Sequence, residues 1–152
     1  MSDKEKLITN MQFIVTHLSQ QADGHAIQSR VFASMGFTKL EAKYAEHAEE
    51  ERGYVIQLID RILDLGGEVK LEAKPAGTVL KDPVEWVKYD LQVSIDGLNL
   101  LKKMLDEARD DVTTFDILKE YYKDEEEDMY WGDAQLELIE AIGLQNWLAK
   151  QL

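Results

Sequence analysis

The sequence predicts an all-α protein, a bundle of four long helices followed by a short fifth helix. Along four long segments, apolar residues recur at alternating spacings of three and four, which is typical of a helix with one buried face. Only two of the 152 residues are proline, so long helices can continue without interruption. The length is close to that of one domain, and we therefore expect a single domain spanning residues 1–152.

A glycine separates the first two predicted helices. The apolar stripe of the first helix covers about residues 4–35, and Gly36 suits the left-handed conformation that ends many helices. The sequence Thr-Lys-Leu-Glu at residues 38–41 predicts a capping box that opens the second helix. The second stripe then continues to Leu65, where a pair of glycines ends it.

A long connection precedes the third predicted helix. Residues 67–82 have no helical period and contain a proline and a glycine. Asp82 is the expected N-cap of the third helix, Pro83 its first residue and Glu85 the residue that returns a cap contact.

The fourth helix is expected to open at the pair Asp110-Asp111 and to end at Gly143. Residues 144–152 are long enough for a short fifth helix. Because this tail is apolar and too short to be stable without partners, its tryptophan and leucines predict contacts with other subunits. The apolar residues in question are Trp147, Leu148 and Leu152.

The lengths of the connections predict the topology. Links of two or three residues join the first helix to the second and the third to the fourth, so each pair must be antiparallel. The second helix would be roughly 42 Å long. The connection after it, at roughly 3.3 Å per residue, can run that whole length. We therefore predict two antiparallel hairpins tied by one long crossover, with the second and third helices parallel.

Composition limits the classes of function. There are 17 lysines and arginines against 30 aspartates and glutamates, a net charge of −13, which is unfavourable for binding nucleic acid or an anionic membrane. The absence of cysteine excludes disulfides and thiolate metal sites. The first residues are charged and no apolar run approaches the roughly 18 residues of a membrane span. We therefore expect a cytoplasmic protein.

Polar residues interrupt the apolar stripes near their middles. Glu51 and Glu125 do so on the second and fourth helices, and His25 and Ser94 on the first and third. The two carboxylates are expected to converge inside the bundle, where each must be protonated, paired or bound to a cation. A divalent metal ion between them meets this requirement, and oxygen ligands suit iron, manganese, magnesium or calcium. Without metal, Glu51→Leu is expected to raise thermal stability.

The acidic residues have a second interpretation, because charge runs on helices are usually solvated faces. Residues 46–51 and 124–128 each contain such a run. Five consecutive acids go more than once round a helix, however, so one of them must face inward, and the heptad phase selects Glu125. Asp128 lies three residues further on the same face and is a candidate second ligand.

Two histidines also lie on core-facing stripes. For His25 and His47 we favour a structural role supported by hydrogen bonds over a role as metal ligand, while His25 stays a candidate ligand because of its depth. The candidate metal ligands are Glu51, Glu125, Asp128 and His25.

Several short motifs are distinctive. The most specific are IDRILDLGG at residues 59–67 and IGLQNWL at residues 142–148. With these motifs the chain resembles the bacterioferritins of the ferritin-like superfamily over essentially its whole length. The resemblance implies a ferritin-like four-helix bundle with a short fifth helix. It also implies a homo-oligomer, a hollow cage of 24 subunits that stores ferric mineral.

The resemblance also implies a di-metal oxidation centre. In that family the centre uses a Glu on the first helix, Glu-x-x-His on the second, a Glu on the third and Glu-x-x-His on the fourth. Glu51 and Glu125 fall on the second-helix and fourth-helix glutamates. Tyr54 and Asp128 fall on the two histidines.

Other positions depart further from that pattern. Leu18 and Ser94 stand where the family has glutamates on the first and third helices. Arg52 stands where the family has a haem-ligating methionine, so the expected cofactor is iron or another divalent metal and not haem.

These observations favour a subunit of an iron storage and detoxification cage with a degenerate di-metal centre, and leave its ferrous oxidation activity open. One alternative is a non-catalytic structural shell subunit. Another is a DNA-protecting assembly resembling the miniferritins, against which the net charge of −13 counts.

Overall fold

The computed structural model describes residues 1–152 and is helical, without strands, which confirms the all-α prediction. Its elements are α1 (Asp3–Ser34), α2 (Thr38–Asp64), α3 (Pro83–Glu107), α4 (Val112–Ile142) and α5 (Leu144–Ala149). None of the helices has a stretch apolar and long enough to cross a lipid bilayer.

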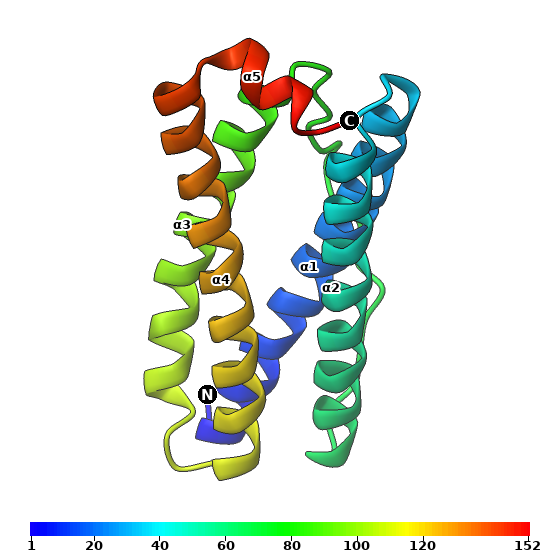
Figure 1. Ribbon diagram of the computed structural model, residues 1–152. Coiled ribbons are helices and arrows are strands. Elements are labelled where there is room, and N and C mark those ends of the chain that lie inside the picture. Colours follow the sequence, from blue (N-terminus) through cyan, green and yellow to red (C-terminus); the bar gives the residue numbers. More distant parts are fainter.

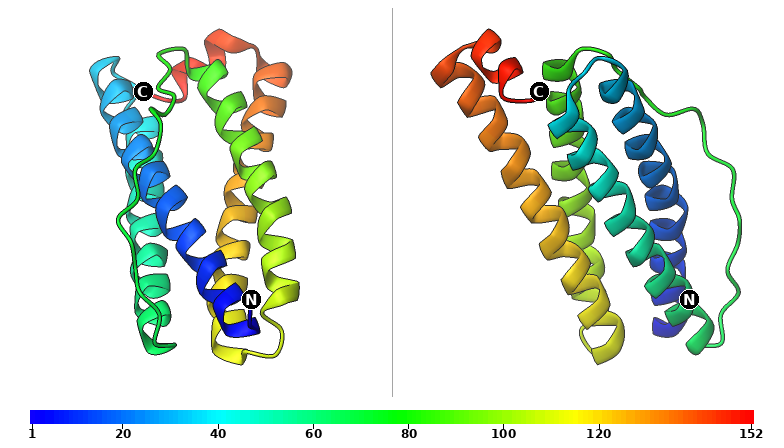
Figure 2. Two further views of the ribbon diagram at one scale, coloured as in Figure 1. Left: turned by 180° about the vertical axis from the view of Figure 1, so that it is seen from behind. Right: turned by 45° about the vertical axis from the view of Figure 1, so that its right-hand side comes forward.

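The four long helices form two antiparallel hairpins, as predicted. α1 packs along α2 and α3 packs along α4 (Figure 1). α2 and α3 run in the same direction, because residues 65–82, here called the crossover, return along the whole length of the bundle (Figure 2). α5 lies across the end of the bundle where α4 ends and α3 begins (Figure 1).

Aspartate side chains cap α3 and α4, as the sequence predicts. Asp82 Oδ1 accepts hydrogen bonds from two backbone N–H groups of the first turn of α3, at 2.9 and 3.1 Å. Asp111 Oδ1 accepts one from Thr114 at 3.0 Å. The return contact expected of Glu85 is not made, because its carboxylate faces Lys88 Nζ at 3.9 Å.

The capping box predicted at residues 38–41 is wrong. α2 does begin at this point, but no side chain caps it. The Glu41 carboxylate instead forms an ion pair with Arg30 at 2.7 Å. The backbone N–H of Lys39 donates to the carbonyl oxygen of Gln151 at 2.9 Å. A backbone N–H group in the first turn of α2 is therefore satisfied by a distant part of the chain.

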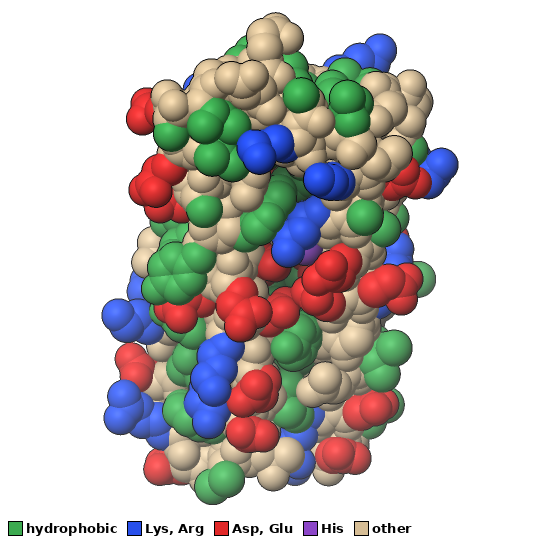
Figure 3. All heavy atoms as spheres, in the orientation of Figure 1, with side chains coloured by type: hydrophobic (Ala, Val, Ile, Leu, Met, Phe, Trp, Pro, Cys, Tyr) green, Lys and Arg blue, Asp and Glu red, His purple; other side chains and the backbone are tan.

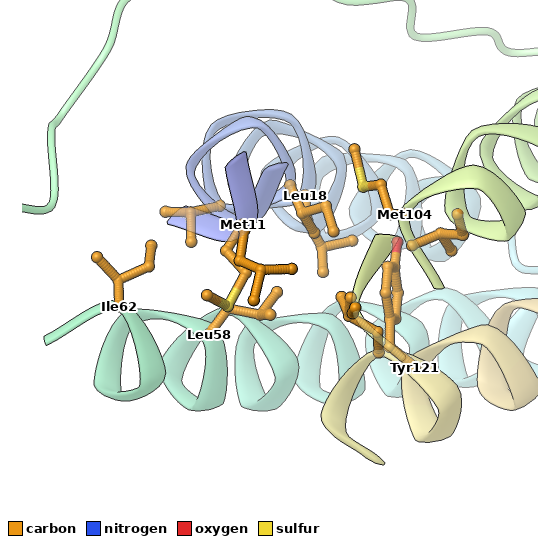
Figure 4. Packing of buried hydrophobic residues seen from close by; sticks show 12 residues of the cluster. Met11, Leu18, Leu58, Ile62, Met104 and Tyr121 are labelled. Carbon is orange, nitrogen blue, oxygen red and sulfur yellow. The ribbon is translucent and has the colours of Figure 1, made fainter. Parts of the chain in front are cut away.

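One apolar cluster fills the half of the bundle near the N-terminus. Figure 4 shows side chains of all four long helices meeting there, among them Leu18 of α1 and Tyr121 of α4. Leu18 is only 2% exposed. The labelled members are Met11, Leu18, Leu58, Ile62, Met104 and Tyr121.

A second apolar cluster lies at the opposite end and includes α5. Trp147 of α5 is fully buried within its own subunit, and its Nε1 donates to Gln135 Oε1 at 3.0 Å. The expectation that Trp147 needs another subunit is therefore wrong, because the ends of the hairpins already enclose it. Leu152 stays exposed. The buried members of this cluster are Phe32, Leu40, Tyr44, Trp86, Val87 and Trp147.

Three glutamines of α1, spaced eight residues apart, hold the crossover by its backbone. The pairs are Gln12 with Lys70, Gln20 with Pro75 and Gln28 with Leu80. In the first and last pairs the amide both donates and accepts, which satisfies backbone groups that have no helix or sheet partner.

Candidate metal centre

His25 lies at the middle of a polar layer in the bundle and joins three helices. Its Nδ1 is 2.5 Å from Glu51 Oε1 on α2, and its Nε2 is 2.8 Å from Asp90 Oδ1 on α3. Burial alone would lower the pKa of this imidazole, but the two carboxylates raise the pKa well above its ordinary value. Without metal, His25 is therefore an imidazolium between two carboxylates.

Both oxygens of Glu51 have a donor. Oε1 faces His25, and Oε2 accepts a hydrogen bond from Gln21 Nε2 at 2.5 Å. Burial raises the pKa of the carboxyl group, and these two donors oppose the increase. Glu51 is therefore paired even without a metal ion, so Glu51→Leu is expected to lower thermal stability and not to raise it.

Glu125 of α4 is the less satisfied of the two glutamates. It is 3% exposed, and its Oε2 has no hydrogen-bond partner. Burial, followed by the nearby charge of Glu51, raises its pKa to about 8. An unpartnered carboxylate oxygen in the core is the arrangement that a bound cation would relieve.

Asp128 lies toward the α2–α4 surface. With Glu50 and Asp124 it places three carboxylate oxygens within 4.8 Å of one another. Burial and the charge of Glu125 raise its pKa to about 9, and burial and the charge of Asp124 raise that of Glu50 to about 7. Figure 3 shows acidic side chains gathered across the middle of this face.

His47 of α2 is 1% exposed, and neither of its ring nitrogens has a hydrogen-bond partner. Asp128 Oδ1 is 3.3 Å from Nε2 but is not oriented to form a hydrogen bond. Burial, with the positive charge of His25 next to it, lowers its pKa to about 3, so the ring is neutral. The prediction that His47 is hydrogen-bonded is wrong, whereas for His25 it is confirmed.

Aromatic rings enclose the two histidines. Tyr44 and Trp86 pack against His25 at centroid distances of 5.6 and 6.0 Å. Tyr44 and Trp131 pack against His47 at 5.3 and 6.1 Å. The two imidazoles themselves lie 5.5 Å apart in an edge-on arrangement. The polar layer is therefore bounded by apolar rings toward α5.

The structure brings the predicted site residues into one neighbourhood. His25 contacts Glu51, and the charge of Glu51 acts on Glu125. The charge of Glu125 acts in turn on Asp128, which also lies beside His47 and Asp124.

Sequence reasoning missed two polar residues at the centre of this layer. They are Asp90, which is a partner of His25, and His47, whose ring nitrogens have no partner. The spacing could have marked both residues as facing inward, because His47 and Asp90 each precede a core-breaking polar residue, Glu51 or Ser94, by one helical turn.

Two residues that depart from the expected di-metal pattern pack in or against the apolar core. Leu18 belongs to the apolar cluster near the N-terminus (Figure 4). Tyr54 packs against the same cluster, with its ring 5.3 Å from that of Tyr121. This side of the polar layer therefore offers no further ligand.

Comparisons with known proteins agree with this architecture. A family model described as a ferritin-like domain matches residues 17–142. The bacterial ferritin of Neisseria meningitidis serogroup B is 34% identical over 156 aligned residues, which cover 100% of both chains. That of Synechocystis is 30% identical over 155 residues, covering 100% of this chain and 99% of the relative. The bacterioferritin of Mycobacterium tuberculosis is 29% identical over 129 residues, 82% of this chain and 79% of the relative.

Proposed function

The chain belongs to the ferritin-like family, and from that membership we propose that it is a subunit of an iron storage and detoxification assembly with its own internal metal site. The observation that carries the proposal is the buried pair Glu51 and Glu125, in which Glu125 Oε2 has no partner within the protein. Relatives named bacterial ferritin that match the whole chain support iron as the metal.

In this proposal Glu125 and Glu51 supply the first oxygens to an entering ferrous ion, and Asp128 supplies a third from the α2–α4 face. His25 belongs to the site through its Nδ1, which holds Glu51 Oε1 at 2.5 Å. Two further carboxylates, Glu50 and Asp124, lie beside Asp128 and lead cations inward from the surface.

The same residues are too few for rapid oxidation of iron in pairs. A two-metal centre needs carboxylates that bridge both ions, held roughly 3.5–4 Å apart, with further ligands to each. Leu18 lies in the apolar cluster, and the Tyr54 hydroxyl donates to the carbonyl oxygen of Glu120 at 3.4 Å, so neither residue supplies a carboxylate or an imidazole. We therefore expect at most one tightly bound ion per subunit at Glu51 and Glu125, and slow oxidation.

Iron loading tests this function. Ferrous iron is mixed anaerobically with the metal-free protein, unbound iron is removed, and the iron content per subunit is measured. Compared with the natural sequence, Glu125→Gln should lose the iron held at Glu51 and Glu125, whereas the exposed Glu127→Gln, on the same helix, should retain it. Equal retention in both variants would contradict the proposed site.

Stopped-flow mixing of ferrous iron with oxygen tests the rate. The natural sequence should show no fast phase that consumes two irons per subunit. The combined variant Leu18→Glu, Tyr54→His, Ser94→Glu and Asp128→His should gain one. A folded, metal-loaded variant without a fast phase would show that these positions do not correspond to the family's ligands.

A non-catalytic shell subunit is the second candidate function. It is favoured by one observation: Leu18 is buried in the core at the position where the bacterioferritin pattern has a glutamate ligand. In that case the loading experiment would yield no iron above the level of Glu125→Gln, while the assembly remained intact.

A further inference from the structure

His47 presents two buried ring nitrogens without partners, and it faces His25 and Asp90. We propose that His25, His47 and Asp90 bind one divalent transition-metal ion, at a second site that adjoins the one at Glu51 and Glu125 and lies nearer to α5. Each ligand comes from a different helix: α1, α2 and α3.

The distances suit a metal ion. One ligand atom from each of the three residues lies within 4.8 Å of the other two. Ligands about 2.1 Å from an ion and at right angles are about 3.0 Å apart. His25 Nε2 and Asp90 Oδ1 are already 2.8 Å apart, so this pair needs to open only slightly. A ring nitrogen of His47 supplies the third ligand.

The donor set selects a class of ion. Two imidazole nitrogens and one carboxylate oxygen suit ferrous iron, zinc or cobalt, whereas magnesium and calcium prefer oxygen ligands alone. Binding also removes a cost in the metal-free protein, because His47 has a neutral ring whose nitrogens are cut off from water.

Carboxylates stand beside both imidazoles, as they commonly do around metal-bound histidines. Glu51 Oε1 faces His25 Nδ1 and so turns Nε2 toward Asp90. Asp128 Oδ1 lies 3.3 Å from His47 Nε2. Glu51 is therefore an orienting residue for this ion, in addition to its role in the proposed function.

The three ligands lie at one level of the bundle. His47 and Asp90 each come one turn before the core-breaking positions of α2 and α3. His25 comes two turns after Leu18 on α1, which runs in the opposite direction to α2 and α3. All three ligands are therefore displaced toward α5. On the other side of the polar layer, Leu18 and Tyr121 fill the space with apolar atoms (Figure 4).

A route from solvent reaches two of these ligands. A cavity of about 380 Å³ between α1, α3 and the crossover is lined by both His25 and Asp90. Gln21 and Trp86 also line it. This entrance lies on α1 and α3, away from the acidic face of α2 and α4, so the two sites have separate access.

Cobalt(II) provides the test, because nitrogen ligation gives it a distinctive visible absorption. The metal-free assembled protein is titrated with Co²⁺ alone, and binding is measured by absorbance and by calorimetry. We expect one ion per subunit to give the absorption of nitrogen-ligated cobalt. His47→Leu and Asp90→Asn should each weaken binding by more than the roughly 10–100-fold that follows the loss of a residue which only orients a ligand. His17→Gln, which changes the remaining histidine of the chain, should leave the spectrum unchanged.

Glu125→Gln separates this site from the one in the proposed function. It should retain the cobalt spectrum. A spectrum that survives His47→Leu and is lost in Glu125→Gln would overturn the inference and leave the proposed function standing. Failure of the natural sequence to bind Co²⁺ would also overturn it. Melting temperatures of the metal-free variants verify folding, and Asp90→Asn provides a second, nearly isosteric variant.

Discussion

At the scale of single residues, the two buried glutamates differ in what surrounds them. Glu51 has donors at both oxygens, whereas Glu125 Oε2 has none. In the metal-free protein, Glu125→Leu should raise the free energy of unfolding by about 1–2 kcal/mol. Glu51→Leu should lower it by roughly 2–4 kcal/mol, because His25 and Gln21 would lose their acceptor. Chemical denaturation of both variants measures the difference.

Glu127→Leu is the matched control for these variants, since its side chain is exposed and its removal should change stability by less than about 0.5 kcal/mol. Stabilisation by Glu51→Leu would mean that its hydrogen bonds do not offset the cost of burying the charge.

The raised pKa of Glu125 predicts a pH dependence of stability. The folded metal-free protein keeps a proton on Glu125 up to about pH 8, whereas the unfolded chain releases it near the ordinary glutamate value. The folded state therefore binds more protons in this window, and stability falls as pH rises through it. His25, with its raised pKa, acts in the same direction above pH 6.5.

Between pH 6.5 and 8, Glu125 alone should account for a loss of about 2 kcal/mol, or roughly 5 °C in melting temperature. His47 opposes this trend only at lower pH, because its pKa is lowered from 6.5 to about 3. Thermal melts in chelator-treated buffers at both pH values measure the loss. Glu125→Gln should make the slope shallower, and an unchanged slope would show that Glu125 does not titrate in this range.

Residue-level prediction from sequence succeeded where one helical face decided the outcome. Five consecutive acids cannot all face solvent, so the heptad phase identified Glu125 as buried. It could not identify Asp90 as the partner of His25, because that contact depends on how α1 and α3 are placed together. A helical period reports which side chains face inward but not which of them meet.

At the scale of elements, local signals placed the helix ends, and distant contacts decided some of the caps. Asp82 and Asp111 cap their helices, and Asp111 does so although its Oδ1 also accepts a hydrogen bond from Arg61 at 2.8 Å. At residues 38–41 the same kind of signal failed, because Arg30 takes the Glu41 side chain. That ion pair connects two helices and is not visible in a four-residue motif.

The contacts of α5 predict a stability role within the subunit. A chain ending at Gly143 would lose Trp147, which is fully buried, and the carbonyl oxygen that accepts from Lys39. We expect truncation to lower the free energy of unfolding by roughly 3–5 kcal/mol, the usual cost of losing a buried aromatic side chain. Trp147→Ala should reproduce most of this loss, and Leu152→Ala very little. Denaturant midpoints distinguish these outcomes.

At the scale of the whole molecule, exposed apolar side chains on the α1–α2 hairpin suggest where subunits meet. Ile27, Ile56 and Leu63 are 53%, 59% and 55% exposed. A closed homo-oligomer, which the resemblance to bacterioferritins implies, would bury such side chains. Light scattering at micromolar concentration should therefore give a mass far above that of a dimer.

Ile56→Glu should shift this mass toward small species, because it would place a charge in the interface. Asn99→Glu, which adds the same charge at an exposed position of α3, should not. A monomeric or dimeric natural protein would exclude a cage.

The glutamine side chains that bind the backbone of the crossover fix the number of residues it can contain. Surface connections ordinarily tolerate inserted or deleted residues. Here Gln12, Gln20 and Gln28 are spaced about 12 Å apart along α1, and each meets a backbone group five residues further along the crossover than the last. A residue inserted between Lys70 and Pro75 would move every later carbonyl out of register with its glutamine. The most loop-like part of this chain is therefore one of the least able to change in length.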